Sequence, residues 1–276
     1  MGNRILLNAT KKLYLSGNEF SAGKRTVLLG ALKEGLKSVW EFDETSGSTL
    51  VDQLGIQNLT KQSNVTINNT GKIDKCIYFP GASNSATNVF TNSAYSSLRE
   101  YTVNVWIKDE RIGSAAGAAY YMRSGTDATG FQLFADYRST PYIRAIGQNY
   151  LGQNWLADIP AASMPTVNTW FMVTATMNIF SKTAKIYRNG TLISTNVIKE
   201  YGLGALTNNW TVTSLVLGTY YDGLTYDTCI PASDPCSSLH MKGFMDQLSI
   251  WTRELSPAEI SALYNSGNGL AYSNWT

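Results

Sequence analysis

Tyr101-Thr-Val-Asn-Val-Trp-Ile107 decides the fold, because the apolar residues of this stretch recur at every second position. Successive side chains of an extended strand point to opposite faces, so the odd positions from 101 to 107 form one apolar face. Many short strands separated by Gly, Asn, Asp or Ser predict an all-β sandwich or barrel. Similar runs occupy residues 169–177, 184–188, 192–195, 214–218 and 245–251.

Two local motifs predict a turn and a helix. Asn189-Gly190 lies between two strand-like runs and supplies the positive φ values of a type I′ hairpin turn. In Ser256-Pro-Ala-Glu259, the serine can cap a helix, the proline suits the first helical position and the glutamate closes a capping box. We therefore expect one short helix near the C-terminus, ending at Asn265-Ser-Gly267.

The composition limits the classes of partner. Charged residues make up 15% of the 276 residues, the net charge is +2, and the basic residues form no cluster beyond Lys11-Lys12 and Lys24-Arg25. This balance argues against binding to nucleic acid or to an anionic membrane surface. No apolar run approaches the ~18 residues that span a bilayer, so no membrane insertion is expected.

Residues 1–34 differ from the rest of the chain, because two short apolar stretches flank a polar middle. We expect residues 1–34 to form an N-terminal attachment arm and residues 35–276 to form one domain. Met1 to Phe20 contain neither the apolar core nor the cleavage pattern of a secretory signal, so synthesis in a cytoplasm is expected.

Cysteine and histidine offer little for metal binding or nucleophilic catalysis. Cys229 and Cys236 flank a short proline-containing loop and could pair in an oxidising environment, which the sequence leaves open, whereas Cys76 lies in an apolar run. His240 is the only histidine, which argues against a zinc site of Cys and His and against a Ser-His-Asp system.

Six segments then follow one another in a characteristic order: Gly35–Gly47, Gly71–Gly81, Tyr101–Lys108, Asn168–Val173, Ala184–Leu192 and Gly243–Ile260. In this order they resemble the laminin-G-like jelly rolls of the concanavalin A-like lectin/glucanase superfamily. The resemblance implies an antiparallel jelly-roll sandwich of two sheets, with the short helix at its C-terminal end and the arm at its N-terminal end. This fold serves lectins, adhesins and glycosidases alike, so it does not choose the function.

The resemblance also implies a metal site. Family members often hold a structural calcium ion between the opening loop and the closing strand, which points to Asp52 and Asp246 as ligands. Calcium takes roughly six to eight oxygen ligands. The closing strand of the family usually reads Asp-Glu, whereas this chain has Asp246-Gln247 and lacks one carboxylate. In the alternative interpretation, Asp52 begins a turn and Asp246 caps a strand end without metal.

Glucanases of the same superfamily place three acids at alternate positions of one strand, which brings the nucleophile and the general acid to one side of a cleft. Glu41 and Asp43 alternate in this way, but the third position is Thr45, and Glu44 faces the opposite side. Because the triplet is broken, we expect no enzymatic activity and interpret Glu41 and Asp43 as solvated acids on an edge strand.

The stretch from Tyr220 to Cys236 is an insertion where the family has a short connection. Its aromatic rings can stack on sugars, and its carboxylates can accept hydrogen bonds from sugar hydroxyls. A glycan contact, a protein interface and an inert insertion all stay open at this point. The candidate ligand-binding residues are Tyr220, Tyr221, Asp222, Tyr226 and Asp227.

The whole layout, a short arm followed by one laminin-G-like jelly roll, resembles virion proteins of tailed bacteriophages. The resemblance implies a non-enzymatic decoration, fibre or adhesin of the virion, made in the host cytoplasm. The arm would bind a capsid or tail protein, and the jelly roll, as a monomer or a homo-oligomer, would display loops to host-surface or mucosal glycans. One alternative is a carbohydrate-active enzyme, or its glycan-binding module, on a bacterial surface, and another is a purely structural protein without a glycan ligand.

Overall fold

The structure of the protein, a computed structural model, is described for nine stretches of the chain. They are residues 30–81, 86–89, 99–113, 117–126, 129–148, 154–178, 180–197, 214–219 and 240–275. Most of the arm, the insertion with its candidate ligand-binding residues, and the cysteines at 229 and 236 lie outside these stretches. No helix among the described residues is long and apolar enough to cross a membrane.

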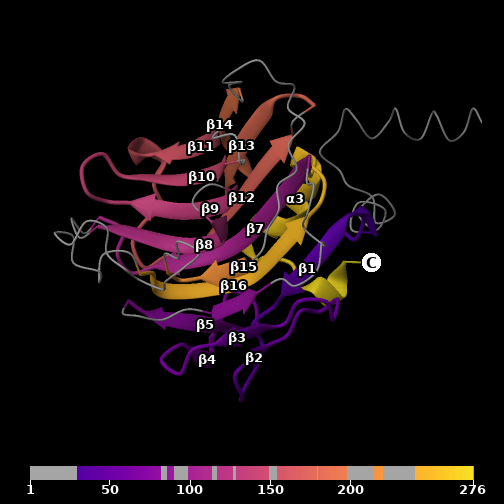
Figure 1. The fold of residues 1–276 in the computed structure, drawn as a ribbon, viewed down its shortest axis with the longest axis vertical. Helices are drawn as coiled ribbons and strands as arrows, with labels where there is room; N and C mark the ends of the chain where they lie inside the picture. The colour runs from indigo at the N-terminus through magenta and orange to yellow at the C-terminus, as the bar shows by residue number, and fades with distance from the viewer. Residues whose placement is uncertain are drawn as a thin grey trace, which may run out of the picture.

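Antiparallel strands form two sheets, as the sequence predicts (Figure 1). In sheet A the order is β14 (Thr191–Val197), β13 (Thr183–Arg188), β12 (Phe171–Asn178), β7 (Glu100–Asp109), β16 (Lys242–Trp251), β5 (Lys75–Pro80) and β4 (Thr66–Thr70), with β1 (Leu36–Trp40) also paired to β16. In sheet B the order is β11 (Asn154–Pro160), β10 (Tyr142–Gln148), β9 (Thr129–Asp136), β8 (Ala118–Thr126), β15 (Ser214–Leu217), β6 (Ala86–Val89), β3 (Leu59–Lys61) and β2 (Thr49–Leu50). The predicted two-sheet antiparallel sandwich is confirmed.

The main core lies between the two sheets. The four odd positions of the 101–107 stretch all belong to this core, which confirms the period-2 interpretation of that stretch. Sheet B contributes the alternate residues Phe131, Leu133 and Ala135 of β9 to the same core. Along one edge the sheets are also joined by hydrogen bonds, since Ser194 Oγ of β14 donates to the Asp158 carbonyl of β11 at 2.9 Å.

A second apolar cluster covers the central part of the outer face of sheet A. The helix α3 (Pro257–Tyr264) lies next to β7 and β12 in Figure 1. Its Ile260 and Leu263 pack in one cluster with outward-facing residues of sheet A and with the C-terminal Trp275. The sheet residues of this cluster are Val39, Trp106, Met172, Tyr187 and Trp251.

The predicted turn and cap are both confirmed. Asn189 and Gly190 have φ values of 52° and 77°, as a type I′ turn requires. Ser256 caps α3 through a capping box with Glu259, and the helix ends at Asn265, which adopts the left-handed conformation.

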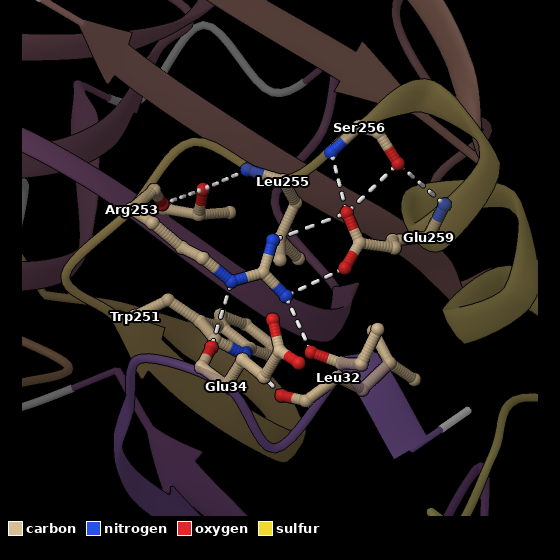
Figure 2. A network of polar contacts seen from close by, with 9 residues as sticks. Leu32, Glu34, Trp251, Arg253, Leu255, Ser256 and Glu259 are labelled. Atoms are coloured by element: carbon tan, nitrogen blue, oxygen red, sulfur yellow. Dashed lines mark hydrogen bonds and ion pairs between the residues drawn. The ribbon is translucent and has the colours of Figure 1, made fainter. Parts of the chain in front are cut away.

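Arg253 ties the start of the described chain to α3, as Figure 2 shows. Its guanidinium forms an ion pair with Glu259 at 2.5 Å and donates to the carbonyls of Ala31 and Glu34 at 2.6 and 2.7 Å. Trp251 Nε1 donates to the nearby Leu32 carbonyl at 2.6 Å. Residues 30–34, which we assigned to the arm, are therefore packed against the domain.

Candidate functional site

Asp52 organises the loop that follows β1. The residue is buried, and its carboxylate accepts three backbone N–H groups: those of Val39 at 2.9 Å, Leu54 at 3.2 Å and Gln57 at 3.0 Å. Its own N–H donates to Asn58 Oδ1 at 3.0 Å. Both carboxylate oxygens are thus used within the protein, so Asp52 holds a loop closed against β1.

Asp246 holds a different turn, the one that precedes β5. Its Oδ2 accepts the backbone N–H groups of Lys72 and Ile73 at 2.8 and 2.9 Å. Its Oδ1 is buried and has no hydrogen-bond partner among the described residues. Burial raises the pKa of Asp246 well above its usual value, although the N–H groups of Ile73 and Lys72 oppose this shift.

These two carboxylates do not fit the calcium ion that the resemblance implies. The Asp52 oxygens face three backbone N–H groups, and only one oxygen of Asp246 is without a partner among the described residues. A calcium ion needs roughly six to eight oxygen ligands. No three His, Cys, Asp or Glu side chains in the described ranges are grouped so that they could hold a metal ion. Calcium binding stays a prediction.

Glu41 and Asp43 do not lie on a strand, which corrects our interpretation of them as exposed acids of an edge strand. The strand β1 ends at Trp40, and Phe42 turns the backbone with a φ of 62°. Glu41 Oε1 accepts the Tyr272 N–H at 2.8 Å, and Asp43 Oδ1 accepts the Lys75 N–H at 2.8 Å. Burial raises the pKa of both carboxyl groups, and backbone N–H groups partly oppose the rise.

The candidate ligand-binding residues at 220–227 lie outside the described residues. The chain on either side of their insertion is described, and we call residues 218–219 and 240–241 its two stems. The Met241 N–H donates to the Gly218 carbonyl at 2.8 Å, and the Gly218 N–H donates to the Tyr121 carbonyl at 3.0 Å. His240 forms an isolated bridge to Tyr120 of β8. The chain therefore leaves and re-enters the described structure beside β8.

A buried network of hydrogen bonds around Asp109 holds these stems in place. The Asp109 carboxylate accepts the hydroxyls of Tyr121 and Tyr137 at 2.8 and 2.6 Å and the Arg111 N–H at 2.6 Å. Burial raises the pKa of Asp109, although these donors oppose the rise. The Arg111 guanidinium in turn donates to the carbonyl of His240. His240 is thus held in the second stem through its backbone carbonyl.

The outer face of sheet B carries a group of partly exposed aromatic residues that the sequence analysis missed. Tyr120 of β8 and Phe134 of β9 are direct cross-strand partners, and their rings stack with centroids 5.0 Å apart and planes at 18°. The ring of Tyr142 on β10 meets Phe134 edge-on at 6.1 Å. We call these three residues the aromatic strip. Its sequence signal is weak, because each strand contributes only one ring.

Two ion pairs border the aromatic strip. Arg144 forms two parallel hydrogen bonds to the carboxylate of Asp158, both at 2.8 Å, and its guanidinium lies 4.5 Å from the centre of the Tyr142 ring. On the other side, Arg138 contacts Asp136 through two nitrogens at 2.8 and 3.1 Å. Aromatic surface flanked by fixed donors and acceptors is typical of sites for polar ligands.

Comparisons with known proteins agree with this architecture. A sequence model of the concanavalin A-like lectin/glucanases superfamily matches residues 82–261. The structure resembles the ligand-binding domain of botulinum neurotoxin serotype D in complex with N-acetylneuraminic acid, with a TM-score of 0.66 and 18% identity over 87% of this chain and 52% of that chain.

A second similar structure comes from botulinum neurotoxin type C, whose cell entry is described as dependent on interaction with two ganglioside molecules. Its TM-score is 0.61, with 17% identity over 84% of this chain and 51% of that chain. The chain thus spans about half the length of these structures, and identities this low show a shared fold alone. No protein with a curated description matches the sequence.

Proposed function

The chain belongs to the concanavalin A-like lectin/glucanase superfamily, and on this premise we propose that it is a glycan-binding protein without catalytic activity. The observation that carries this proposal is that the candidate catalytic and metal-binding carboxylates accept hydrogen bonds from the protein itself. Asp52, Asp246, Glu41 and Asp43 all accept backbone N–H groups from neighbouring segments. Glu41 and Asp246 thereby join the opening and closing parts of the domain, while Asp52 and Asp43 fix turns within the opening part.

A retaining glycosidase needs a different arrangement. It presents two carboxyl groups about 5–5.5 Å apart to a sugar, one as nucleophile and one as general acid. Glu41 accepts a second hydrogen bond from Gln247 Nε2 at 3.2 Å, so its Oε1 is used twice within the protein. Asp43 is tied to the start of β5. This arrangement favours binding over hydrolysis.

The neurotoxin binding domains support the same class of function by analogy. One was solved with N-acetylneuraminic acid, and another belongs to a toxin whose cell entry depends on gangliosides. A shared fold makes a glycan ligand a reasonable starting point, but it does not transfer the sugar. The ligand class for this chain has to come from its own residues.

An array of immobilised glycans tests the proposal directly. We expect the full-length protein to bind a defined subset of glycans above the background of a matched jelly-roll control without lectin activity. A flat response across neutral, sialylated and sulfated glycans would refute the proposed function and favour a purely structural protein.

The enzyme alternative has its own test. If the protein were a glycosidase, a panel of polysaccharides would release reducing ends, and Glu41→Gln and Asp43→Asn would each abolish this release. We expect no release above buffer, and a rate lost in either variant would overturn the non-enzymatic assignment.

We further propose a location for this binding module, in the virion of a tailed bacteriophage. The arm that precedes the domain supports this proposal, since its pattern differs from the rest of the chain and its end at residues 31–34 is fastened to the body by Arg253. An arm fastened to the domain in this way can attach the domain to a capsid or tail protein. Deleting residues 1–29 should leave the domain folded and remove the protein from purified particles, whereas unchanged incorporation would refute the attachment role.

A further inference from the structure

We propose that the aromatic strip on the outer face of sheet B is the glycan-binding surface and that its ligands are neutral glycans. This inference rests on the proposed function and adds the place and the chemical class. The strip consists of Tyr120, Phe134 and Tyr142 on the three neighbouring strands β8, β9 and β10, which lie side by side in Figure 1.

The backbone fixes the spacing of the strip. Tyr120 pairs with Phe134, and Phe134 pairs with Arg144, so the two rings and the guanidinium form one row across three strands. Tyr142 lies two positions before Arg144 on the same face of β10. Strand pairing fixes the backbone, and the ring contacts of Phe134 with Tyr120 and Tyr142 restrain the side chains, so they lose little freedom on binding. The row therefore offers a preformed platform for the apolar faces of sugar rings.

Polar groups for sugar hydroxyls lie at one end of this row and beside it. Asp158 continues the row beyond Arg144, and Asp136 lies directly across from Tyr142, whose hydroxyl approaches it at 3.5 Å. The Asp158 carboxylate has lone pairs beyond the two that Arg144 uses, so it can accept a sugar hydroxyl. Asp136 already accepts three hydrogen bonds from Arg138 and one from the Tyr142 hydroxyl, so a sugar hydroxyl can reach it by replacing the long contact to Tyr142. Ion pairs with two parallel contacts hold both acceptors in fixed positions.

The charges of the bordering groups select the ligand class. Two arginines and two aspartates border the strip, and each arginine is already bound to a carboxylate. The hydrogen bond to Asp158 raises the pKa of Arg144, which favours its charged form. Burial tends to raise the pKa of Asp136, but contacts with Arg138 lower it overall. A sialylated or sulfated glycan would meet arginines whose charge a carboxylate already neutralises, and it would be repelled by those carboxylates, whereas a neutral glycan can bind beside the intact pairs.

The outer face of sheet A provides a matched control. Its central part is covered by α3 and the C-terminal segment. Away from this cover, Tyr78 of β5 donates to Glu110 at 3.4 Å, much as Tyr142 donates to Asp136 at 3.5 Å. Tyr78 also packs against an aromatic neighbour, Phe244, with ring centroids 4.7 Å apart. Tyr78 and Tyr142 are therefore similar residues on opposite faces of the sandwich.

The test compares Tyr142→Ala with Tyr78→Ala in the full-length protein. Both variants and the wild type are applied to cello-, malto- and xylo-oligosaccharides, to N-acetylglucosamine oligomers, and to galactosides with their sialylated and sulfated forms. We expect the wild type to prefer neutral glycans, Tyr142→Ala to weaken this binding at least about tenfold, and Tyr78→Ala to leave it unchanged. Binding to a neutral ligand should also change little between low and high salt, because no net charge is exchanged.

The outcomes separate the two proposals. If the wild type binds no glycan, the proposed function itself fails. If it binds but Tyr142→Ala has no effect, or Tyr78→Ala has the larger effect, the aromatic strip is not the site. A preference for sialylated or sulfated glycans, with binding that falls as salt rises, would overturn the neutral ligand class. Thermal unfolding of both variants shows whether a loss of binding reflects a loss of fold.

Discussion

Replacing Asp52 should destabilise the domain strongly, and by the same amount with or without calcium. Asp52→Ala removes the acceptor of three backbone N–H groups, of which those of Val39 and Gln57 belong to buried residues. A buried donor without a partner costs about 1–3 kcal/mol. The third donor, on Leu54, is partly buried and can turn to water. At about 2 kcal/mol for each of the two buried donors, we expect a loss of about 4 kcal/mol in the free energy of unfolding.

Asp52→Asn provides a graded comparison. The amide keeps one oxygen for the N–H groups of Val39 and Leu54, but it places an NH₂ group against the N–H of Gln57. The order of stability should be wild type, then Asp52→Asn, then Asp52→Ala, with the asparagine variant losing about 1–3 kcal/mol.

Urea unfolding followed by tryptophan fluorescence measures these losses, since Trp40, Trp251 and Trp275 are fully buried. Each protein is measured once in a chelator and once in millimolar calcium. Equal losses in the two buffers would support a purely structural carboxylate. If the wild type gained stability from calcium and Asp52→Ala did not, Asp52 would be a metal ligand and the reasoning above would be wrong.

Three further predictions follow from buried or paired groups. Arg253→Ala should lower the free energy of unfolding by about 2–3 kcal/mol and speed amide exchange at residues 31–36, because it removes the ion pair to Glu259 and one hydrogen bond to each of two carbonyls. Unchanged exchange there would show that the packing of Leu32 alone holds this segment. Asp246→Asn should be at least as stable as the wild type at pH 7 and should lose this advantage near pH 4. Burial raises the folded-state pKa of Asp246 above 3.8, so ionisation of this group costs stability as the pH rises above 3.8. If Asp246→Asn were much less stable than the wild type at pH 7, the fold would need the charged form. Burial raises the pKa of Cys76 to about 12, so its thiol should not react with a thiol reagent in the folded protein at pH 8. After unfolding without reductant, one reactive thiol would indicate a Cys229–Cys236 disulfide, and three would refute it.

Much of the fold follows from local patterns in the sequence. The alternation in residues 101–107 predicts which side chains enter the core, and Asn189-Gly190 and Ser256–Glu259 predict a turn and a cap, because each depends only on near neighbours. The alternation of Glu41 and Asp43 misled us for a specific reason. Phe42 is a buried, non-glycine residue with positive φ, which local preferences do not predict, and it ends the strand geometry.

The aromatic strip could not be predicted from the sequence, because it depends on strand register. Tyr120, Phe134 and Tyr142 are separated along the chain, and a shift of one residue in either pairing would move a ring to the other face. A bulge between Tyr120 and Met122 further changes which residues of β8 face outward. In the same way, the role of Asp246 depends on a turn more than 170 residues away in the sequence.

The most direct test of a binding protein without catalysis is to incubate the wild type with neutral oligosaccharides and to measure retention and chain length in the same sample. We expect one or more of the oligosaccharides to be retained by the immobilised protein and to be recovered at its original length after a day. Shortened products that appear with the wild type and not with Glu41→Gln would contradict this assignment and show an enzyme.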